Sequence, residues 1–216
     1  MPTTDHAKAL LEGVAARYAS LTSYSDCGSV NTQLIDNDRM FTTIFSTWYK
    51  KPSLYRFEFE RPYPYWPLQN ITTRNAVVFD GRTAYISEQT GTDAPQTECA
   101  ESFSLAIAAA TGVSAGSAHS IGRLLIPAIG GLSILDLVDL RQDIDTVIDG
   151  VSCYAVAARY PKCATPEMEF AIEKVTLLIR RIRTTLSGAS GFSATELRHD
   201  IRVNEPIDDV MFGRAA

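Results

Sequence analysis

The side chains best suited to proton transfer near neutral pH are the three histidines, His6, His119 and His199. The segment Ala118–Gly122 is a near match to the nucleophile elbow of serine hydrolases, the turn that carries the catalytic serine. Ser120 would be that nucleophile. Asp143 or Asp145, then His199, follow in the Ser–Asp–His order of that class. The elbow, however, needs a buried strand before the serine, and the residues preceding Ser120 make a poor strand. A serine hydrolase is therefore the remote alternative, and we expect no catalysis.

The other charged groups favour a solvated surface over a reaction site. Glu58 and Glu60 share a strand face with Arg56, which is typical of a wet outer face. Three arginines lie close together along one segment, Arg180, Arg181 and Arg183. Because they divide between two faces, they do not predict a broad phosphate patch, although a carboxylate or lipid headgroup contact stays open. No glycine-rich phosphate loop or metal-ligand spacing occurs, so no cofactor or metal is expected.

Composition places the chain among folded proteins with one sizeable core. It has 216 residues, 45% hydrophobic and 21% charged, which predicts a single domain over residues 1–216. The formal net charge of −5 makes nucleic acid an unlikely class of partner. No apolar run approaches the roughly 20 residues of a membrane-spanning helix, since charges, prolines and glycines interrupt the stretch 121–140.

Hydrophobic periodicity predicts a helix followed by strands in the first half of the chain. Residues 5–21 carry Ala7, Leu10, Leu11, Val14 and Tyr18 at helical spacing. Residues 40–49 alternate with apolar groups on both sides, which predicts a strand covered on both faces. In residues 55–60, aromatic and charged side chains alternate cleanly, which predicts one dry face and one wet face. Asp80-Gly81 predicts a hairpin between 76–79 and 83–87.

A helical insertion and further strands make up the second half. Residues 97–110 are compatible with a helix, and a short apolar helix is predicted over 121–126, within a glycine-rich segment. Strands are then predicted at 140–148, 151–160, 168–172, 177–185 and 195–203. Strands joined by tight turns form antiparallel sheets. We therefore predict an α+β fold, with a strongly curved antiparallel sheet and helices packed on one face.

Several short motifs resemble the LolA/LolB-like superfamily of periplasmic lipoprotein carriers. They are the helix end Ala16–Leu21, the basic-proline-aromatic stretch Tyr49–Phe57, the Asp-Gly-Arg hairpin Val78–Tyr85, the segment Ile179–Ile182 and the strand end Val203–Ile207. The resemblance implies a half-barrel whose helices form a lid over an apolar cavity on the concave face. It also implies a periplasmic or exported protein, whose signal peptide is not part of this sequence. The implied partners are a hydrophobic molecule, a lipid or a lipoprotein acyl chain, with envelope proteins as further candidates.

Within that resemblance, Lys51 occupies the position of an arginine that closes the lid in the carrier. A lysine offers a point charge and not a planar fork, so the manner of closing differs. The side chains expected to line the cavity are aromatic or aliphatic: Phe45, Tyr49, Tyr55, Phe57, Phe59, Val78, Tyr85, Ile107, Leu124, Leu125 and Ile129. The same residues can instead form a filled core, which would suit an envelope interaction or sensor module.

The four cysteines, Cys27, Cys99, Cys153 and Cys163, contain no C-x-x-C pair. They fit either a cytosolic protein with reduced thiols or an exported protein with disulfides. The resemblance favours export. Cys153 and Cys163 then flank one strand and its turn and form the favoured pair, with Cys27 and Cys99 a weaker second pair.

Overall fold

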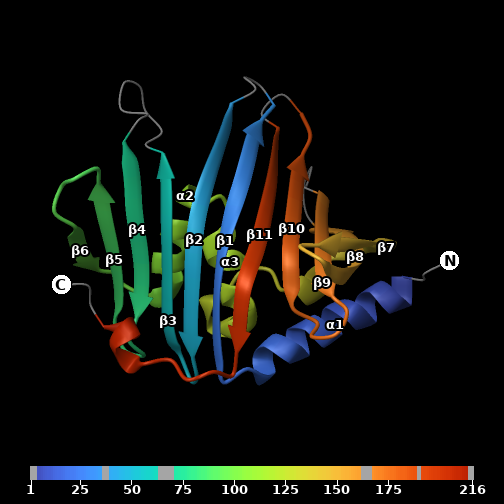
Figure 1. Ribbon diagram of the computed structural model, residues 1–216, viewed down its shortest axis with the longest axis horizontal. Helices are drawn as coiled ribbons and strands as arrows, with labels where there is room; N and C mark the ends of the chain where they lie inside the picture. Colours follow the sequence, from blue (N-terminus) through green and yellow to red (C-terminus); the bar gives the residue numbers. More distant parts are fainter. Residues whose placement is uncertain (1–3, 36–38, 63–70, 162–166, 189–190, 214–216) are drawn as a thin grey trace. The chain divides into compact units, whose positions relative to one another are not determined.

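The computed structural model describes residues 4–35, 39–62, 71–161, 167–188 and 191–213. Eleven strands in this part of the chain are hydrogen-bonded into one open sheet, in the order β6-β5-β4-β3-β2-β1-β11-β10-β9-β8-β7 (Figure 1). The strand pairs whose register is described all run antiparallel. The predicted α+β class with an antiparallel sheet and an N-terminal helix is therefore confirmed.

The strands are β1 (Ser23–Leu34), β2 (Met40–Lys50), β3 (Leu54–Pro62), β4 (Thr72–Phe79), β5 (Ala84–Thr90), β6 (Gln96–Cys99), β7 (Val138–Ile148), β8 (Val151–Arg159), β9 (Glu167–Glu173), β10 (Ile179–Leu186) and β11 (Phe192–Val203). The helices are α1 (Thr4–Ser20), α2 (Phe103–Val113), α3 (Ser117–Ser120) and α4 (Gly122–Leu125), with 3-10 turns η1 (Pro127–Ile129), η2 (Ile134–Asp136) and η3 (Asp209–Phe212). The helix predicted over 97–110 begins later than expected, because Gln96–Cys99 pairs with β5 as a strand.

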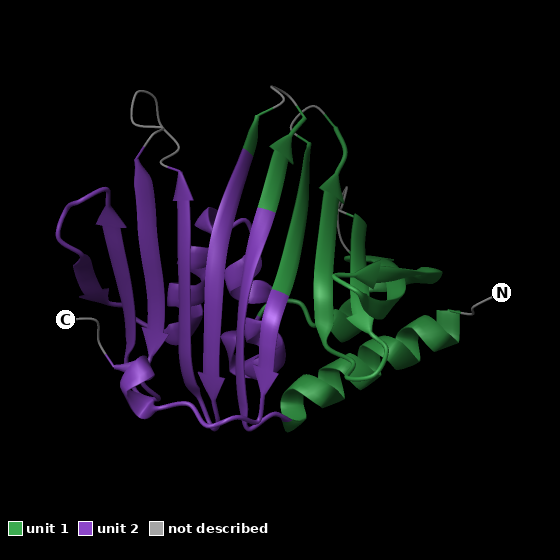
Figure 2. Ribbon diagram, viewed as in Figure 1, with its two compact units in different colours: residues 1–20, 31–40, 131–198 green, residues 21–30, 41–130, 199–216 purple. Residues whose placement is uncertain are grey.

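The chain divides into two compact units (Figure 2). Unit 1 contains Met1–Ser20, Asn31–Met40 and Gly131–Arg198, and unit 2 contains Leu21–Val30, Phe41–Gly130 and His199–Ala216. Strands β1 and β11 contribute residues to both. The expectation of a single domain stays a prediction.

In unit 1, helix α1 buries the apolar stripe that the sequence predicts. Ala7, Leu10, Leu11, Val14 and Tyr18 are its buried residues, and the helix contacts β7 and η2. The hydroxyl group of buried Tyr18 accepts a hydrogen bond of 3.1 Å from the backbone N–H of Ile179, at the start of β10. Helix α1 is thus held by apolar packing and by one polar contact with the sheet.

Charges in unit 1 are paired across and along the strands. Arg180 donates to Glu173 at 2.8 Å, and Arg181 pairs with Glu169 on β9. On β11 the inward-facing side chains are Glu196 and Arg198, which form an ion pair while Arg198 is only 1% exposed. Arg180 and Arg181 therefore have carboxylate partners within unit 1. The sequence pattern did not predict that the charged face of β11 is the buried one.

The two edge strands of the sheet differ in length and regularity. Strand β6 has only four residues, whereas β7 has eleven. The pairing of β7 with β8 shifts register twice, between Val138 and Arg141 and again between Asp143 and Thr146. Ile144, within the second shift, is 91% exposed.

In unit 2, the helices α2, α3 and α4 lie on one face of the strands (Figure 2). Helix α2 contacts β4 and β5, and it also contacts α3 and η1. The N-terminus of α2 is capped by Ser102, whose hydroxyl accepts a hydrogen bond from the N–H of Leu105. We call the segment from α2 to η1 (residues 103–129) the cover.

Replacing Tyr18 with phenylalanine tests how α1 is attached. The change leaves the buried N–H of Ile179 without its described acceptor, so the free energy of unfolding is expected to fall by about 1–3 kcal/mol. Urea denaturation measures the loss. Tyr154→Phe is a matched control, because the described contacts of Tyr154 are made by its ring. Equal stability of Tyr18→Phe and the control would contradict the assigned role.

Candidate functional site

The dry face of unit 2 is set by the register of β3 against its neighbours. Tyr55, Phe57 and Phe59 lie opposite Tyr49, Thr47 and Phe45 of β2, respectively. Directly opposite residues of an antiparallel pair point to the same face. This register therefore places five of the predicted aromatic residues on one buried face, Phe45, Tyr49, Tyr55, Phe57 and Phe59.

Ring contacts join this aromatic face to the cover. Phe57 lies 5.7 Å, centroid to centroid, from both Phe45 and Phe59. Phe103, the first residue of α2, lies 5.4 Å from Tyr55 and stacks on Phe79 of β4 at 4.5 Å. Burial raises the pKa of Tyr49, so its phenol stays neutral and adds no charge to the face.

The cover supplies the other predicted apolar residues and buries all of them: Ile107, Leu124, Leu125 and Ile129. Helices α3 and α4 have only four residues each. Gly116, before α3, and Gly130, after η1, adopt φ of 93° and 84°, a region that favours glycine. Helices this short have little stability of their own, so the cover depends on its packing against the sheet.

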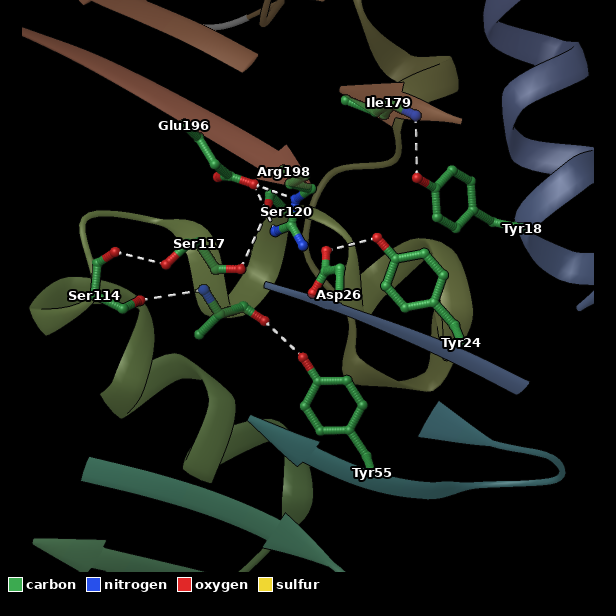
Figure 3. A network of polar contacts seen from close by, with 11 residues as sticks. Tyr18, Tyr24, Asp26, Tyr55, Ser114, Ser117, Ser120, Ile179, Glu196 and Arg198 are labelled. Atoms are coloured by element: carbon green, nitrogen blue, oxygen red, sulfur yellow. Dashed lines mark hydrogen bonds and ion pairs between the residues drawn. The ribbon is translucent and has the colours of Figure 1, made fainter. Parts of the chain in front are cut away.

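Polar contacts fix the cover at its middle (Figure 3). The hydroxyl of Tyr55 donates to the carbonyl of Ala118 at 3.3 Å, and the hydroxyl of Ser114 accepts the N–H of Ala118 at 3.1 Å. Ser117 donates in turn to the carbonyl of Ser114 at 2.8 Å. A β-carbon added at Gly122 would lie 3.0 Å from the Tyr55 hydroxyl, which shows how closely α4 approaches β3.

His119 joins α3 to the end of the cover. Its Nε2 lies 2.9 Å from the carbonyl of Gly130, in position to donate a hydrogen bond. Burial lowers the pKa of His119, and the positive charge of Arg123 lowers it further, against the opposing effect of that hydrogen bond. The neutral imidazole is therefore the form that the cover favours.

Val78 and Tyr85 do not share the aromatic face, which corrects the prediction for both. They pair with each other, and Val78 also lies opposite Arg56, so they point to the charged face of the strands. Val77 lies opposite Phe57, and Ile86 lies opposite Val77, so these two residues take the inward positions. Both faces of β4 carry valine at this point, and alternation alone therefore left the choice ambiguous.

The charged face also receives the end of the chain. The ammonium group of Lys50 donates to the carbonyl of Ile207 at 3.0 Å and to Asp209 at 2.6 Å. Arg56 donates to the carbonyl of Met211 at 3.1 Å, and η3 packs against β3. The sequence did not predict these contacts. The residue expected to close the lid, Lys51, is exposed in the turn after β2, and its role stays a prediction.

Ser120 lacks the context of a hydrolase nucleophile. It ends the one-turn helix α3, where its hydroxyl donates to the carbonyl of Ser117 at 3.1 Å, and the segment before it is helical. Within unit 2, His199 lines a groove on the charged face, opposite to the face that carries the cover. Asp143 and Asp145 pair with Arg141 and Lys174 in unit 1. Among the described residues, no group of three or more potential ligands is placed to hold a metal ion.

The thiols of Cys27, Cys99 and Cys153 are free in the structure, so the weaker pair, Cys27 with Cys99, is not formed. Cys163 lies outside the described residues, but because the Cys153 thiol is free, the favoured pair is not formed in the structure either. A buried hydrogen bond that the sequence did not reveal joins the hydroxyl of Tyr24 to Asp26 at 2.6 Å (Figure 3). The two residues lie two positions apart on β1 and therefore share a face, in a strand that the sequence did not predict.

Helices in the described part of the chain lack the combination of length and hydrophobicity that crossing a membrane requires. No family model matches the chain, and no curated protein matches it in sequence.

Solved structures match almost the whole chain. LprF from Mycobacterium bovis has a TM-score of 0.57 at 10% identity, with 96% of each chain covered. The lipoprotein LppX from Mycobacterium tuberculosis has a TM-score of 0.55 at 16% identity, covering 95% of this chain and 99% of LppX. MucB has a TM-score of 0.52 at 11% identity, covering 98% of this chain and 64% of MucB. Likeness at such identities shows the fold alone: the chain has the fold of LppX and LprF.

Proposed function

We propose that this chain is a non-catalytic, exported protein of the periplasm that binds an acyl chain or a similar apolar ligand between the aromatic face of unit 2 and its cover. The observation that carries the proposal is the pairing of five buried aromatic residues with a cover of short, apolar helices. The fold shared with the lipoprotein LppX supports an envelope location and a lipid or lipoprotein partner.

The chemistry of the two surfaces suits an uncharged ligand. The aromatic face presents rings from β2 and β3, and the cover presents Ile107, Leu124, Leu125 and Ile129. Apolar walls with few polar groups are typical of sites for hydrophobic molecules. Each methylene of an acyl chain moved from water into such a site contributes about 0.8 kcal/mol.

The cover must move for a ligand to enter, and its construction permits this. Helices α3 and α4 end after one turn, and the positive-φ residue Gly116 separates α3 from α2. The hydrogen bond from Tyr55 to Ala118 is a point of attachment that can break without disturbing the sheet ladder. The energy of ligand burial then offsets the lost contacts between cover and sheet.

A second candidate is an envelope interaction or sensor module whose interior stays filled. It is favoured by the ring contacts around Phe57 and Phe103, with centroid distances between 4.5 and 5.7 Å. Ligand titration separates the two candidates, because a permanently filled interior gives no saturable binding.

Charge placed on either apolar surface is expected to abolish binding. Leu125→Asp and Phe57→Asp introduce a carboxylate where a ligand carbon would lie, at a cost of several kcal/mol. Fluorescence titration of the delipidated protein with a fluorescent fatty acid measures the effect. Ile44→Asp is the matched control, because Ile44 is 52% exposed on the opposite face of β2.

Circular dichroism identifies any variant that fails to fold. Leu125→Asp changes the cover and not the sheet, so it is expected to keep the sheet intact. Saturable binding that is equal in wild type, Leu125→Asp and Ile44→Asp would eliminate this site. Saturable binding that wild type and Ile44→Asp retain and Leu125→Asp loses would support it.

Loosening the attachment of the cover is expected to speed ligand entry. Tyr55→Phe removes the hydrogen bond to Ala118, whose contribution is about 1 kcal/mol, so the entry rate should rise roughly fivefold. Stopped-flow fluorescence measures the rate. Gly112→Ala serves as the control, because an added β-carbon there meets no atom within 4 Å. A wild-type entry rate in Tyr55→Phe would show that this contact does not hold the cover.

Acid is expected to weaken the cover through His119. Because burial lowers its pKa in the folded state, the unfolded chain binds the proton more readily. The stabilisation is complete above the unfolded value of about 6.5 and is lost as the pH falls towards the lowered folded value. Urea denaturation at pH 7 and pH 5 should therefore show a smaller pH dependence in His119→Asn than in wild type. An unchanged pH dependence would assign the effect to other groups.

A further inference from the structure

A groove of about 530 Å³ opens on the charged face of unit 2. We call it the outer groove; its lining includes Cys27, Ser46, Arg56, Glu58, Arg74 and His199. Its volume lies within the range of about 300–1,000 Å³ usual for small-molecule sites. Ser46 lies opposite Glu58 in the β2–β3 register, alternate to the aromatic residues. The outer groove therefore opens on the face opposite to the cover, and Phe45 and Phe59 of the aromatic face also contribute to its lining.

The groove brings a thiol and an imidazole together from neighbouring strands. Cys27 belongs to β1 and His199 belongs to β11, and these two strands are neighbours in the strand order of the sheet. Both residues line the outer groove.

The surroundings of His199 suit it to accept a proton. Its Nδ1 lies 3.2 Å from a carboxylate oxygen of Asp200, in position to donate a hydrogen bond. In that tautomer, Nε2 carries no proton and is the nitrogen that can act as a base. Cys27 lies 3.4 Å, Sγ to Oγ, from Ser46 of β2. The lining of the groove thus includes a nucleophile and a base, and a carboxylate adjoins the base.

The other described cysteines lack this combination. Cys153 is fully buried, and burial raises the pKa of its thiol. Cys99 is exposed at the end of the short edge strand β6 and is not part of the groove lining. Only Cys27, among these three, is both partly accessible and part of a groove that a histidine also lines.

We propose that the outer groove is a thiol-exchange site, in which Cys27 forms a mixed disulfide with a small, charged disulfide molecule and His199 acts as the base. The groove carries Arg56 and Arg74 beside Glu58 and Glu60. These side chains complement a molecule that bears both carboxylates and an amine, such as a disulfide of the glutathione class.

The reaction balances without a further reagent. Nε2 of His199 takes the proton of the Cys27 thiol, and the thiolate attacks one sulfur of the small disulfide. The disulfide bond of that molecule breaks as the bond to Cys27 forms. The departing thiolate then takes the proton from His199, which leaves the mixed disulfide and one free thiol.

Intact-mass spectrometry of the full chain after incubation with oxidised glutathione tests the proposal, with peptide mapping to assign the adduct. We expect a glutathionyl group on Cys27 that is lost in Cys27→Ser and retained at the wild-type rate in Cys99→Ser. In His199→Gln the rate at pH 7 should fall about tenfold, because only roughly 3% of an ordinary thiol is ionised there.

At pH 10 the rates of His199→Gln and wild type should converge, since the thiol ionises without a base. The charged groups facing Cys27 and His199 in this comparison are Asp200, Arg56 and Glu58, and they are unchanged in both proteins. Modification of other cysteines with Cys27 untouched would overturn the proposal. A wild-type rate at pH 7 in His199→Gln would also overturn it. The outcome is independent of acyl-chain binding, which concerns the opposite face.

Discussion

Strict alternation along β3 is the constraint on which the rest of unit 2 depends. Tyr55, Phe57 and Phe59 point to one face, and Arg56, Glu58 and Glu60 point to the other. A slip of one residue would exchange the two sets, burying three charges and exposing three aromatic rings. The cost of that exchange fixes the register with β2 and β4. It also fixes which face receives the cover and which carries the outer groove and the end of the chain.

The two faces of the strands in unit 2 have opposite requirements, because one must be covered and the other stays in water. The aromatic face needs a dry partner, and the cover provides it without contributing much stability of its own, because its helices are short. The charged face keeps water but holds its side chains through ion pairs, such as Arg56 with Glu58 and Arg74 with Glu60. The more exposed of these two pairs, Arg74 with Glu60, contributes little free energy. The aromatic face of unit 2 therefore provides most of the stability. The side chains of the charged face can differ with little effect on the free energy of unfolding.

Residues with an unambiguous period were predictable from the sequence, and ambiguous ones were not. The buried stripe of α1 and the aromatic face of β3 follow directly from helical and alternating patterns. Val78 was misplaced because valines occupy both faces of β4 at that point, so hydrophobicity could not choose. The burial of Arg198 was not predicted, because hydrophobicity favours a leucine over an arginine on the buried face of a strand. The ion pair with Glu196 allows Arg198 to be buried instead. Cys27 and His199 are 172 positions apart, and only the strand order joins them.

The ends of the open sheet have a consequence for its behaviour at high concentration. An exposed edge strand is a template on which another chain can add hydrogen bonds and start a fibril. In this sheet β6 offers only four residues, and the regular spacing of β7 is interrupted twice. A strand from a neighbouring molecule would find few consecutive partners at either edge. The short β6 and the irregular β7 thus limit polymerisation through the edges of the described sheet.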